Sequence, residues 1–537
     1  MLSRSHFNRR FIVISLLVIC IILGLQALSL SSVHYPSVNR VPDWLWPSSS
    51  TGLLPPLWID DLDPLTLPDV RESDFCTDRF SPRYLEGLRD NGLQYCPSSA
   101  SSQFTCFHTQ LRDQDSPDSF CIGQDVVFDV VNQVFRLDCE PRGVDANESA
   151  RGLVGVDGLK TVWFDTGPRY LVDKYVEFNS NPERAATVAD MEKGAAPEFT
   201  VLLKREGNRN FWHSMMEIFS MSLAFDTLRI SRDPGNDGQP FFRFPDDIEN
   251  TQIVILDDQP NQPWFDLWRM FSGREPVRLK DILADPHQAE QFADLRRNII
   301  LPLAGGSNPL WHNDWAVRDC RHAPLLRLFV RRVMVRAGLT FETGPRPTAE
   351  GDKKDIRLTF LKRKGSRKLL QDEALLDAIR SNYPRVEVKS VDMGSLSLPE
   401  QLRTIQETDL LLGVHGAGLT HMMFMREGAG AVVEIQPEGL SHKGFRNLAA
   451  MTGQKYFVAQ AEIVSAEEEE EREKERERER EKQEEPPKGG NRERAARRGE
   501  KNWQSSAVRI DEERFLALVD AALKSLYNEG LRSHDVV

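Results

Sequence analysis

The second half of the chain alternates short apolar runs with amphipathic segments. The apolar runs predict strands, and segments with apolar residues three and four positions apart predict helices between them. Because strands that alternate with helices form parallel sheets covered on both faces, this pattern predicts an α/β domain over residues 339–461. The expected strands are 356–361, 386–388, 410–414, 431–435 and 455–458, and the expected helices are 372–381, 398–408, 419–426 and 444–452.

The flanking regions differ in regularity. With 537 residues the chain is long enough for two large domains, and we predict a first α/β domain over residues 74–338. Residues 462–503 are dominated by Glu, Arg and Lys and contain too few apolar residues to build a core. We interpret them as a surface insertion without a catalytic role, either a solvated single helix or a disordered segment. A closing strand and an amphipathic helix are expected within residues 504–530.

The N-terminus predicts the compartment. Residues 11–30 form an uncharged, mostly apolar run of about the length needed to cross a bilayer. Three arginines precede it, so the positive-inside rule keeps residues 1–10 in the cytosol and sends the rest of the chain across the membrane. We predict a type II transmembrane anchor followed by a Ser- and Pro-rich stem over residues 31–73. The alternative is a signal peptide that is cleaved near residues 27–29.

Cysteine usage agrees with an oxidising compartment. One cysteine lies inside the predicted anchor, and the other six are candidates for disulfides whose pairing the sequence leaves open. Asn147 begins the sequence Asn-Glu-Ser, a candidate N-glycosylation site. The formal net charge of -13 argues against a nucleic-acid partner. The candidate disulfide residues are Cys76, Cys96, Cys106, Cys121, Cys139 and Cys320.

A glycine-rich turn lies inside the second predicted domain. Residues 408–435 predict a strand, a turn, a helix and a second strand, which together form half of a nucleotide-binding fold. Glycines allow close backbone approach to a ligand, and a helix N-terminus favours a phosphate. The turn matches neither the dinucleotide fingerprint nor the P-loop. The candidate donor-binding residues of this turn are Gly413, His415, Gly416, Ala417 and Gly418.

The turn has two other interpretations. An ordinary tight glycine turn in an α/β domain would need no ligand. The letters HGAG also resemble the oxyanion-hole segment of some lipases, although the chain contains no G-x-S-x-G nucleophile elbow.

Two further features are expected at the same edge of the sheet. Arg363 and Arg367 lie in a basic loop directly after the strand 356–361, and ligands of parallel sheets bind beyond the carboxyl ends of the strands. Guanidinium groups pair well with diphosphate oxygens, whereas the alternative is a solvated basic turn. Glu434, near the end of strand 431–435, is either a ribose ligand or an ordinary acid at the end of a strand.

Candidate base residues occur in the first domain. His213 and Glu217 are four positions apart at the start of a predicted helix, so they share a face and could remove a proton from an acceptor hydroxyl. The alternative is a surface i,i+4 pair. Asp-x-Asp, a metal–diphosphate motif, matches at residues 61–63, which lie in the stem, and Asp257-Asp258 is a weak metal candidate. We therefore expect arginines and a helix N-terminus to neutralise the diphosphate, without a divalent metal ion or another cofactor.

Together these motifs resemble glycosyltransferase family 61. The resemblance rests on N-x-x-H-x-x-x-E at residues 210–217, R-x-x-x-R at 363–367, GVHGAGLTH at 413–421 and VEI-x-P at 433–437. It implies two Rossmann-like domains that face a cleft, the GT-B type, with a nucleotide-sugar site in the second domain. It also implies an inverting transferase of the secretory pathway. Family members usually carry Asp after the histidine with variable spacing, so Glu217 departs from the pattern.

The resemblance leads to a specific hypothesis. A UDP-sugar, N-acetylglucosamine favoured and xylose next, donates its sugar to a hydroxyl of a glycoprotein or glycan. The anchor and the absence of an ER-retention sequence at the end of the chain favour a Golgi membrane over the endoplasmic reticulum, with the catalytic part in the lumen. The competing hypotheses are a membrane-anchored esterase and a non-catalytic binding protein that kept the fold.

Overall fold

The computed structural model describes most of the chain between the predicted stem and the closing helix. The predicted tail and anchor, nearly all of the stem and residues 466–501 of the charged insertion lie outside the described residues. None of the described helices combines the length and apolar character that spanning a bilayer would require. The described residues are 72–111, 116–179, 198–207, 210–235, 238–243, 245–261, 264–313, 315–346, 356–465, 502–528 and 534–536.

The first half is built around a mixed sheet of nine strands. Along the main path the order is β1-β2-β3-β9-β6-β7-β8, and β4 and β5 extend the sheet from β3. Neighbours from β1 to β9 are antiparallel, whereas β9, β6, β7 and β8 are mutually parallel. The strands are β1 (Gly92–Gln94), β2 (Gln103–His108), β3 (Ser119–Asp129), β4 (Val134–Leu137), β5 (Val176–Phe178), β6 (Glu198–Leu203), β7 (Gln252–Ile255), β8 (Val277–Arg278) and β9 (Arg297–Leu301).

The antiparallel part departs from the parallel sheet that the sequence suggested. The links from β1 to β2 and from β2 to β3 are too short to hold a crossover helix, so these strands can only turn back on their neighbours. A disulfide between Cys106 and Cys121 joins directly opposed residues of β2 and β3. All six candidate cysteines are paired, since Cys76 is bonded to Cys320 and Cys96 to Cys139.

One long helix forms the centre of the first half. Helix α7 (Phe211–Ile230) is apolar around most of its circumference and buried along most of its length. Its N-cap is Asn210, whose side chain accepts hydrogen bonds from the backbone N–H groups of Trp212 and His213. The other helices are α2 (Asp74–Phe80), α3 (Pro82–Asp90), α4 (Ala146–Ala150), α5 (Pro168–Tyr175), α8 (Pro245–Glu249), α9 (Asp266–Ser272), α10 (Leu279–Ala284), α11 (Pro286–Ala293) and α12 (Pro324–Arg336), with 3-10 turns η3 (Val156–Gly158), η4 (Trp163–Asp165), η5 (Gly305–Ser307) and η6 (Trp311–Asn313).

The second half contains the predicted parallel sheet. Its order is β11-β10-β12-β13-β14-β15, and β10 to β14 are parallel to their neighbours. Strand β15 is antiparallel to β14, and β16 also pairs with β14. The strands are β10 (Ile356–Leu361), β11 (Val386–Val391), β12 (Leu410–Val414), β13 (Ala431–Pro437), β14 (Lys455–Val464), β15 (Ala507–Arg509) and β16 (His534–Val536).

The helices of this half match the prediction except at the glycine-rich turn. Residues 417–424 form the 3-10 helix η8 (Ala417–Phe424) rather than an α-helix. Its apolar side chains pack against α7 and α14, which places the turn directly beside the first half. The α-helices are α13 (Asp372–Asn382), α14 (Leu398–Gln406), α15 (Gly444–Thr452) and α17 (Glu512–Tyr527). A further 3-10 turn, η7 (Met393–Ser395), lies directly before α14.

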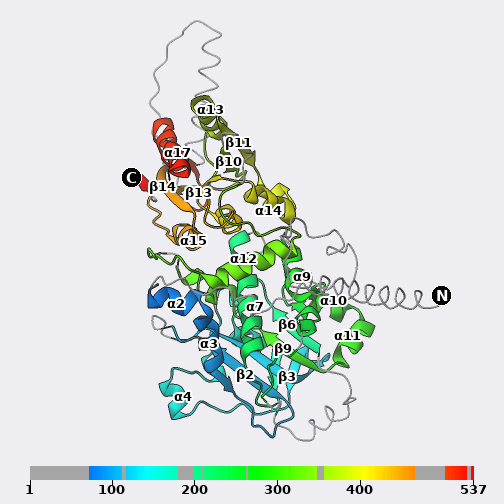
Figure 1. Ribbon diagram of the computed structural model, residues 1–537. Helices are drawn as coiled ribbons and strands as arrows, with labels where there is room; N and C mark the ends of the chain where they lie inside the picture. The colour runs from blue at the N-terminus through cyan, green and yellow to red at the C-terminus, as the bar shows by residue number, and fades with distance from the viewer. Residues whose placement is uncertain are drawn as a thin grey trace, which may run out of the picture.

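The two halves share a continuous hydrophobic core. The same cluster of buried residues includes Met215 and Phe219 of α7, Phe329 of α12 and Met422 of η8. In Figure 1, α12 crosses between the two sheets, and α7 extends from the first sheet towards the second. This packing sets the start of α7 opposite the carboxyl ends of β10, β12 and β13. The mixed α/β fold that the sequence predicted is therefore confirmed.

Candidate active site

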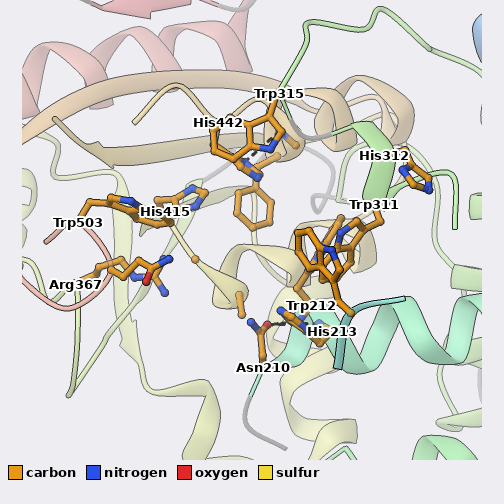
Figure 2. Close-up of a pocket in the computed structure, with 16 residues that line it drawn as sticks. Asn210, Trp212, His213, Trp311, His312, Trp315, Arg367, His415, His442 and Trp503 are labelled. Carbon is orange, nitrogen blue, oxygen red and sulfur yellow. Dashed lines mark hydrogen bonds between the residues drawn. The ribbon is translucent and has the colours of Figure 1, made fainter. Parts of the chain in front are cut away.

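A large cavity with a volume of about 740 Å³ lies between the two halves. The first half contributes the start of α7 and the turns η4 and η6, and the second half contributes the HGAG turn and the start of α15 (Figure 2). Another side is lined by Trp503, the last residue of the predicted insertion 462–503, and by Gln504, so that end of the insertion is part of the cavity wall and not only a surface segment. Tryptophan and histidine dominate the lining, through Trp163, Trp212, Trp311, Trp315, Trp503, His213, His312, His415 and His442.

His213 is held by a buried carboxylate. Its Nδ1 lies 2.9 Å from Oε2 of Glu206, whose side chain is fully buried. The other oxygen of Glu206 accepts a hydrogen bond of 2.8 Å from the backbone N–H of Gly306. A carboxylate in that position fixes the proton of a neutral imidazole on Nδ1 and leaves the lone pair of Nε2 available. The pair is therefore arranged as a general base at the wall of the cavity.

Glu217 does not share this role, which corrects the expectation from its spacing. It is buried behind His213 and does not line the cavity. One of its oxygens accepts a 2.5 Å hydrogen bond from the backbone N–H of Glu206. Burial, with the nearby charge of Glu206, raises the pKa of Glu217 well above its ordinary value. Glu217 thus supports the backbone at Glu206, and Glu206 is the acid that contacts His213.

Glu206 was missed because its role is set by tertiary contacts. It follows β6 at the carboxyl end of a parallel strand, and that position is the only signal available in the sequence.

The HGAG turn brings two arginines against a glycine backbone. Gly416 has a φ of 147°, and a Cβ atom there would lie 2.2 Å from Nη1 of Arg363 and 3.3 Å from Cζ of Arg367. Nη1 of Arg363 also donates to the backbone oxygen of His415 over 3.4 Å, and its Nε donates to the oxygen of Ser366 over 3.0 Å. Only glycine leaves room for both guanidinium groups beside the turn.

The two arginines form an uncompensated cationic pair. Among the described residues neither guanidinium has a carboxylate partner within salt-bridge distance. Burial, followed by the charge of Arg367, lowers the pKa of Arg363 to about 10, and burial also lowers the pKa of Arg367. Arg367 lies 5.7 Å from the centre of the Trp503 ring and lines the cavity. Two partly desolvated cations without an anion suit a ligand that brings negative charge.

Glu434 does not face a ligand, which corrects its expected contact with ribose. Its side chain is completely buried, and Oε1 lies 2.5 Å from Nδ1 of His415. Oε2 accepts a hydrogen bond from the hydroxyl of Tyr456. Burial alone would raise the pKa of Glu434, but the contacts with His415 and Tyr456 hold it below its ordinary value. Glu434 therefore orients His415 in the cavity wall, as Glu206 orients His213.

The predicted glycines have different surroundings. Gly413 lies at the buried end of β12, where a Cβ atom would meet the side chains of Leu361 and Leu419 at 3.2–3.3 Å, so its role is packing. Ala417 lines both the large cavity and a second one of about 320 Å³. Gly418 and Arg363 line only the second cavity. Of the predicted donor residues, Arg367, His415 and Gly416 line the large cavity, Arg363 and Gly418 line the second, Ala417 lines both, and Gly413 and Glu434 line neither.

The weak metal candidate Asp257-Asp258 is engaged in ion pairs. Asp257 accepts two hydrogen bonds from the guanidinium of Arg205, and Asp258 pairs with Lys280. In the described part of the chain, the one group of three potential metal ligands contains the Cys76–Cys320 disulfide, which offers no thiolate. The Asp-x-Asp of the stem lies outside the described residues.

Two other predictions concern the alternative functions and glycosylation. No serine or cysteine is among the described residues that line the large cavity, so the HGAG turn has no hydrolase nucleophile beside it there. Asn147 is exposed on α4, where a glycan could be attached, and its glycosylation stays a prediction.

Comparison with known proteins finds a family match for the middle of the chain. Residues 211–432, from the start of α7 to the middle of β13, match the family model described as Glycosyltransferase 61. Over these residues, which are less than half of the chain, it is similar to glycosyltransferase family 61.

Proteins similar to this chain include three named EGF domain-specific O-linked N-acetylglucosamine transferase. The protein from Drosophila melanogaster is 25% identical over 260 residues, which are 48% of this chain and 44% of the relative. The protein from Bos taurus is 31% identical over 194 residues, 36% and 34% of the two chains. The protein from Mus musculus is 36% identical over 173 residues, 32% and 30% of the two chains. The chain spans less than half the length of these relatives.

The family match covers the two arginines, the HGAG turn and His213, but not the whole cavity. Glu206, Trp163 and Trp503 lie outside the matched residues 211–432. The wall that contains Arg367 and the HGAG turn therefore lies within the matched residues, and a large share of the other walls belongs to segments outside the family model.

Proposed function

We propose that the chain is an inverting glycosyltransferase that moves a sugar from a UDP-sugar to a hydroxyl of a glycoprotein or glycan. The observation that carries this proposal is one cavity with His213, held by the buried Glu206, on one wall and Arg367 and Gly416 on another. Arg363 lies beside Gly416 and faces the adjoining smaller cavity. N-acetylglucosamine is the favoured sugar, in keeping with the names of the relatives, and xylose is the next candidate.

The donor spans the boundary between the two cavities. Its diphosphate lies against Gly416, where the guanidinium groups supply the positive charge. The nucleoside enters the smaller cavity, which is lined by Asp392, directly after β11, and by Lys364, its ion-pair partner at 2.7 Å. The sugar enters the larger cavity. This arrangement corresponds to the GT-B type, with two Rossmann-like domains facing a cleft.

The reaction is a single displacement. Nε2 of His213 takes the proton of the acceptor hydroxyl while its oxygen attacks the anomeric carbon from the face opposite the diphosphate. The bond between that carbon and the phosphate oxygen breaks, and its electron pair stays on UDP, where Arg363 and Arg367 stabilise the charge. Positive charge builds up on the sugar ring as in glycoside hydrolysis, and the configuration at the anomeric carbon inverts.

The setting of this reaction is also part of the proposal. Three disulfides in the first half suit an oxidising lumen, and residues 11–30 supply the type II anchor to a Golgi or endoplasmic reticulum membrane. The arginines neutralise the leaving diphosphate, so we propose that catalysis needs no divalent metal ion.

Release of UDP from a panel of UDP-sugars tests the proposal. The chain is produced in a secretory host so that its disulfides form, and each donor is assayed with and without EDTA. We expect release from one donor, unchanged by EDTA. Release that EDTA abolishes would refute metal independence alone. The absence both of release and of thermal stabilisation by UDP would refute the donor site itself.

A further inference from the structure

Exposed aromatic side chains surround the mouth of the large cavity. Trp163 and Trp315 are 64% and 67% exposed although both line the cavity, and Phe164 beside Trp163 is 55% exposed. Large apolar groups left in water at the rim of a cavity mark a surface that a ligand covers. Because this rim is continuous with the proposed catalytic cavity, its ligand is the acceptor and not a separate partner.

The turn that carries Trp163 is strained. Val162, Phe164 and Asp165 have φ values of 56–57°, a conformation that non-glycine residues, and β-branched valine above all, rarely adopt. Such strain persists where surrounding contacts over-determine the backbone, and it concentrates at ligand-binding sites.

The contacts that hold this turn are visible at its base. The backbone N–H of Gly167 donates to the oxygen of Thr161 over 2.6 Å, and the hydroxyl of Thr166 donates to the oxygen of Trp163 over 2.8 Å. Lys204 donates to the backbone oxygen of Phe164. A Cβ atom on Gly167 would lie 2.3 Å from a backbone oxygen, so the turn closes tightly only with glycine there. The fold thus maintains a strained turn that leaves the rings of Trp163 and Phe164 exposed to solvent.

The rings are arranged around the proposed base. Trp163 meets Trp311 edge to face with ring centres 5.7 Å apart, and Trp311 meets His213 in the same way at 4.8 Å. Trp315 meets His442 at 5.2 Å on another side of the cavity, as Figure 2 shows. An acceptor that brings its hydroxyl to Nε2 of His213 must therefore pass between aromatic surfaces.

The chemistry of this lining selects a neutral, hydroxyl-rich acceptor. The described residues that line the large cavity include no Asp, Glu or Lys, and their one charged side chain is Arg367 on the donor side. Histidine, asparagine and glutamine edges beside tryptophan faces suit a sugar, whose hydroxyls hydrogen-bond and whose C–H groups meet the negative face of a ring.

A peptide would be recognised differently. Extended peptides usually add to an exposed strand edge, whereas Trp163 and Trp311 stand on the 3-10 turns η4 and η6.

We propose that the acceptor is a neutral glycan and that Trp163 and Trp315 clamp the sugar that receives the transfer. This inference rests on the proposed function and specifies the chemical class of its acceptor substrate. Of the two tryptophans, Trp163 precedes the residues that match the family model, whereas Trp315 lies within them. The proposed acceptor subsite is therefore built partly from residues outside the family match.

Saturation-transfer NMR on the full-length chain with UDP present tests this directly. The probes are methyl glycosides and short oligosaccharides of mannose, galactose, xylose, arabinose and N-acetylglucosamine, compared with an unglycosylated folded EGF domain. We expect saturation of ring protons of at least one oligosaccharide. Trp163→Ala and Trp315→Ala should each weaken that sugar's binding about tenfold. Trp163→Phe should retain most of it, and Tyr527→Ala, an equally exposed ring on α17, should change nothing.

The UDP signals serve as the folding control in every variant. Sugar binding that survives both alanine substitutions would overturn the clamp. Binding of the EGF domain, with no sugar bound, would overturn the glycan acceptor while leaving the donor site in place. A wild-type chain that binds no UDP would instead refute the proposed function on which this inference rests.

Discussion

Oε2 of Glu206 lies 2.9 Å from Nδ1 of His213, although the two residues belong to different elements, the end of a strand and the start of a helix. The contact orients an imidazole whose other nitrogen is left for a substrate. Glu217, four residues after His213 on the same helix, instead supports the backbone of Glu206.

This relationship predicts opposite results for two isosteric substitutions. Glu206→Gln should lower kcat by about 10- to 100-fold, because an amide neither fixes the tautomer of His213 nor stabilises the imidazolium. Glu217→Gln should keep kcat near wild type, because a buried acid whose pKa is raised already resembles its neutral form. Initial rates at saturating donor compare the two. Equal losses would show that Glu206 has no special role.

The HGAG turn allows a second prediction with a matched glycine-to-alanine control. Gly416→Ala places a methyl group 2.2 Å from Nη1 of Arg363 and should displace that guanidinium, which weakens UDP binding by about 2 kcal/mol, or roughly thirtyfold in Kd. The control is Gly87→Ala on α3, which lines neither cavity, meets no atom within 4 Å and should bind UDP normally. Calorimetric titration with UDP measures both. Normal UDP affinity in Gly416→Ala would remove the diphosphate from this turn.

Arg367→Ala should change stability and affinity in opposite directions. Without ligand, loss of one of two neighbouring cations relieves repulsion and desolvation, so Tm should stay the same or rise. With UDP, the increase in Tm should be much smaller than in wild type. Arg380→Ala, on the exposed face of α13, is the control and should show the wild-type increase. A full response to UDP in Arg367→Ala would contradict its role.

Stability should fall with acidity because of His108. This ring is buried between the hydroxyls of Ser119 and Tyr95, and burial lowers its pKa from 6.5 to about 4. The unfolded chain takes up a proton below pH 6.5 and the folded chain does not, so stability is lost as pH falls from about 6.5 towards 4. The loss in the free energy of unfolding reaches roughly 3 kcal/mol at about pH 4.

Thermal unfolding at several pH values isolates this contribution. His108→Gln should flatten the decline of Tm over that window, whatever its absolute stability. His287→Gln, at an exposed position on α11, should keep the wild-type slope. An unchanged slope in His108→Gln would assign the decline to other groups.

The sequence predicted the second sheet well because its signal is local. Strands such as β10 and β12 are continuous apolar runs separated by amphipathic helices, and the register of a parallel sheet follows from that alternation. The antiparallel strands β1 to β3 were missed because short hairpins carry no such periodic signal.

The site was predictable only where a motif marks it. Gly416, Arg363 and Arg367 could be recognised because glycine and basic residues after strands have few other uses. Glu206 and Trp503 carry no such motif. Glu206 lies only seven residues before His213, but their contact depends on how the end of β6 and the start of α7 are placed in the fold. Trp503 reaches the site from a segment distant in sequence, and such pairing leaves no local pattern. Glu434 was misassigned because an acid near a strand end has the same sequence signal whether it faces a ligand or a neighbouring histidine.

The most direct test of the central claim compares UDP binding and UDP release in the wild type and His213→Ala. The claim is that one wall of the cavity binds the donor and the other performs the proton transfer. We predict that both proteins bind UDP with the same Kd, whereas His213→Ala releases UDP from the preferred UDP-sugar, in the presence of acceptor, about 100- to 10,000-fold more slowly. Equal rates of release in the two proteins would show that His213 is not the base, and absence of UDP binding in the wild type would contradict the account at its root.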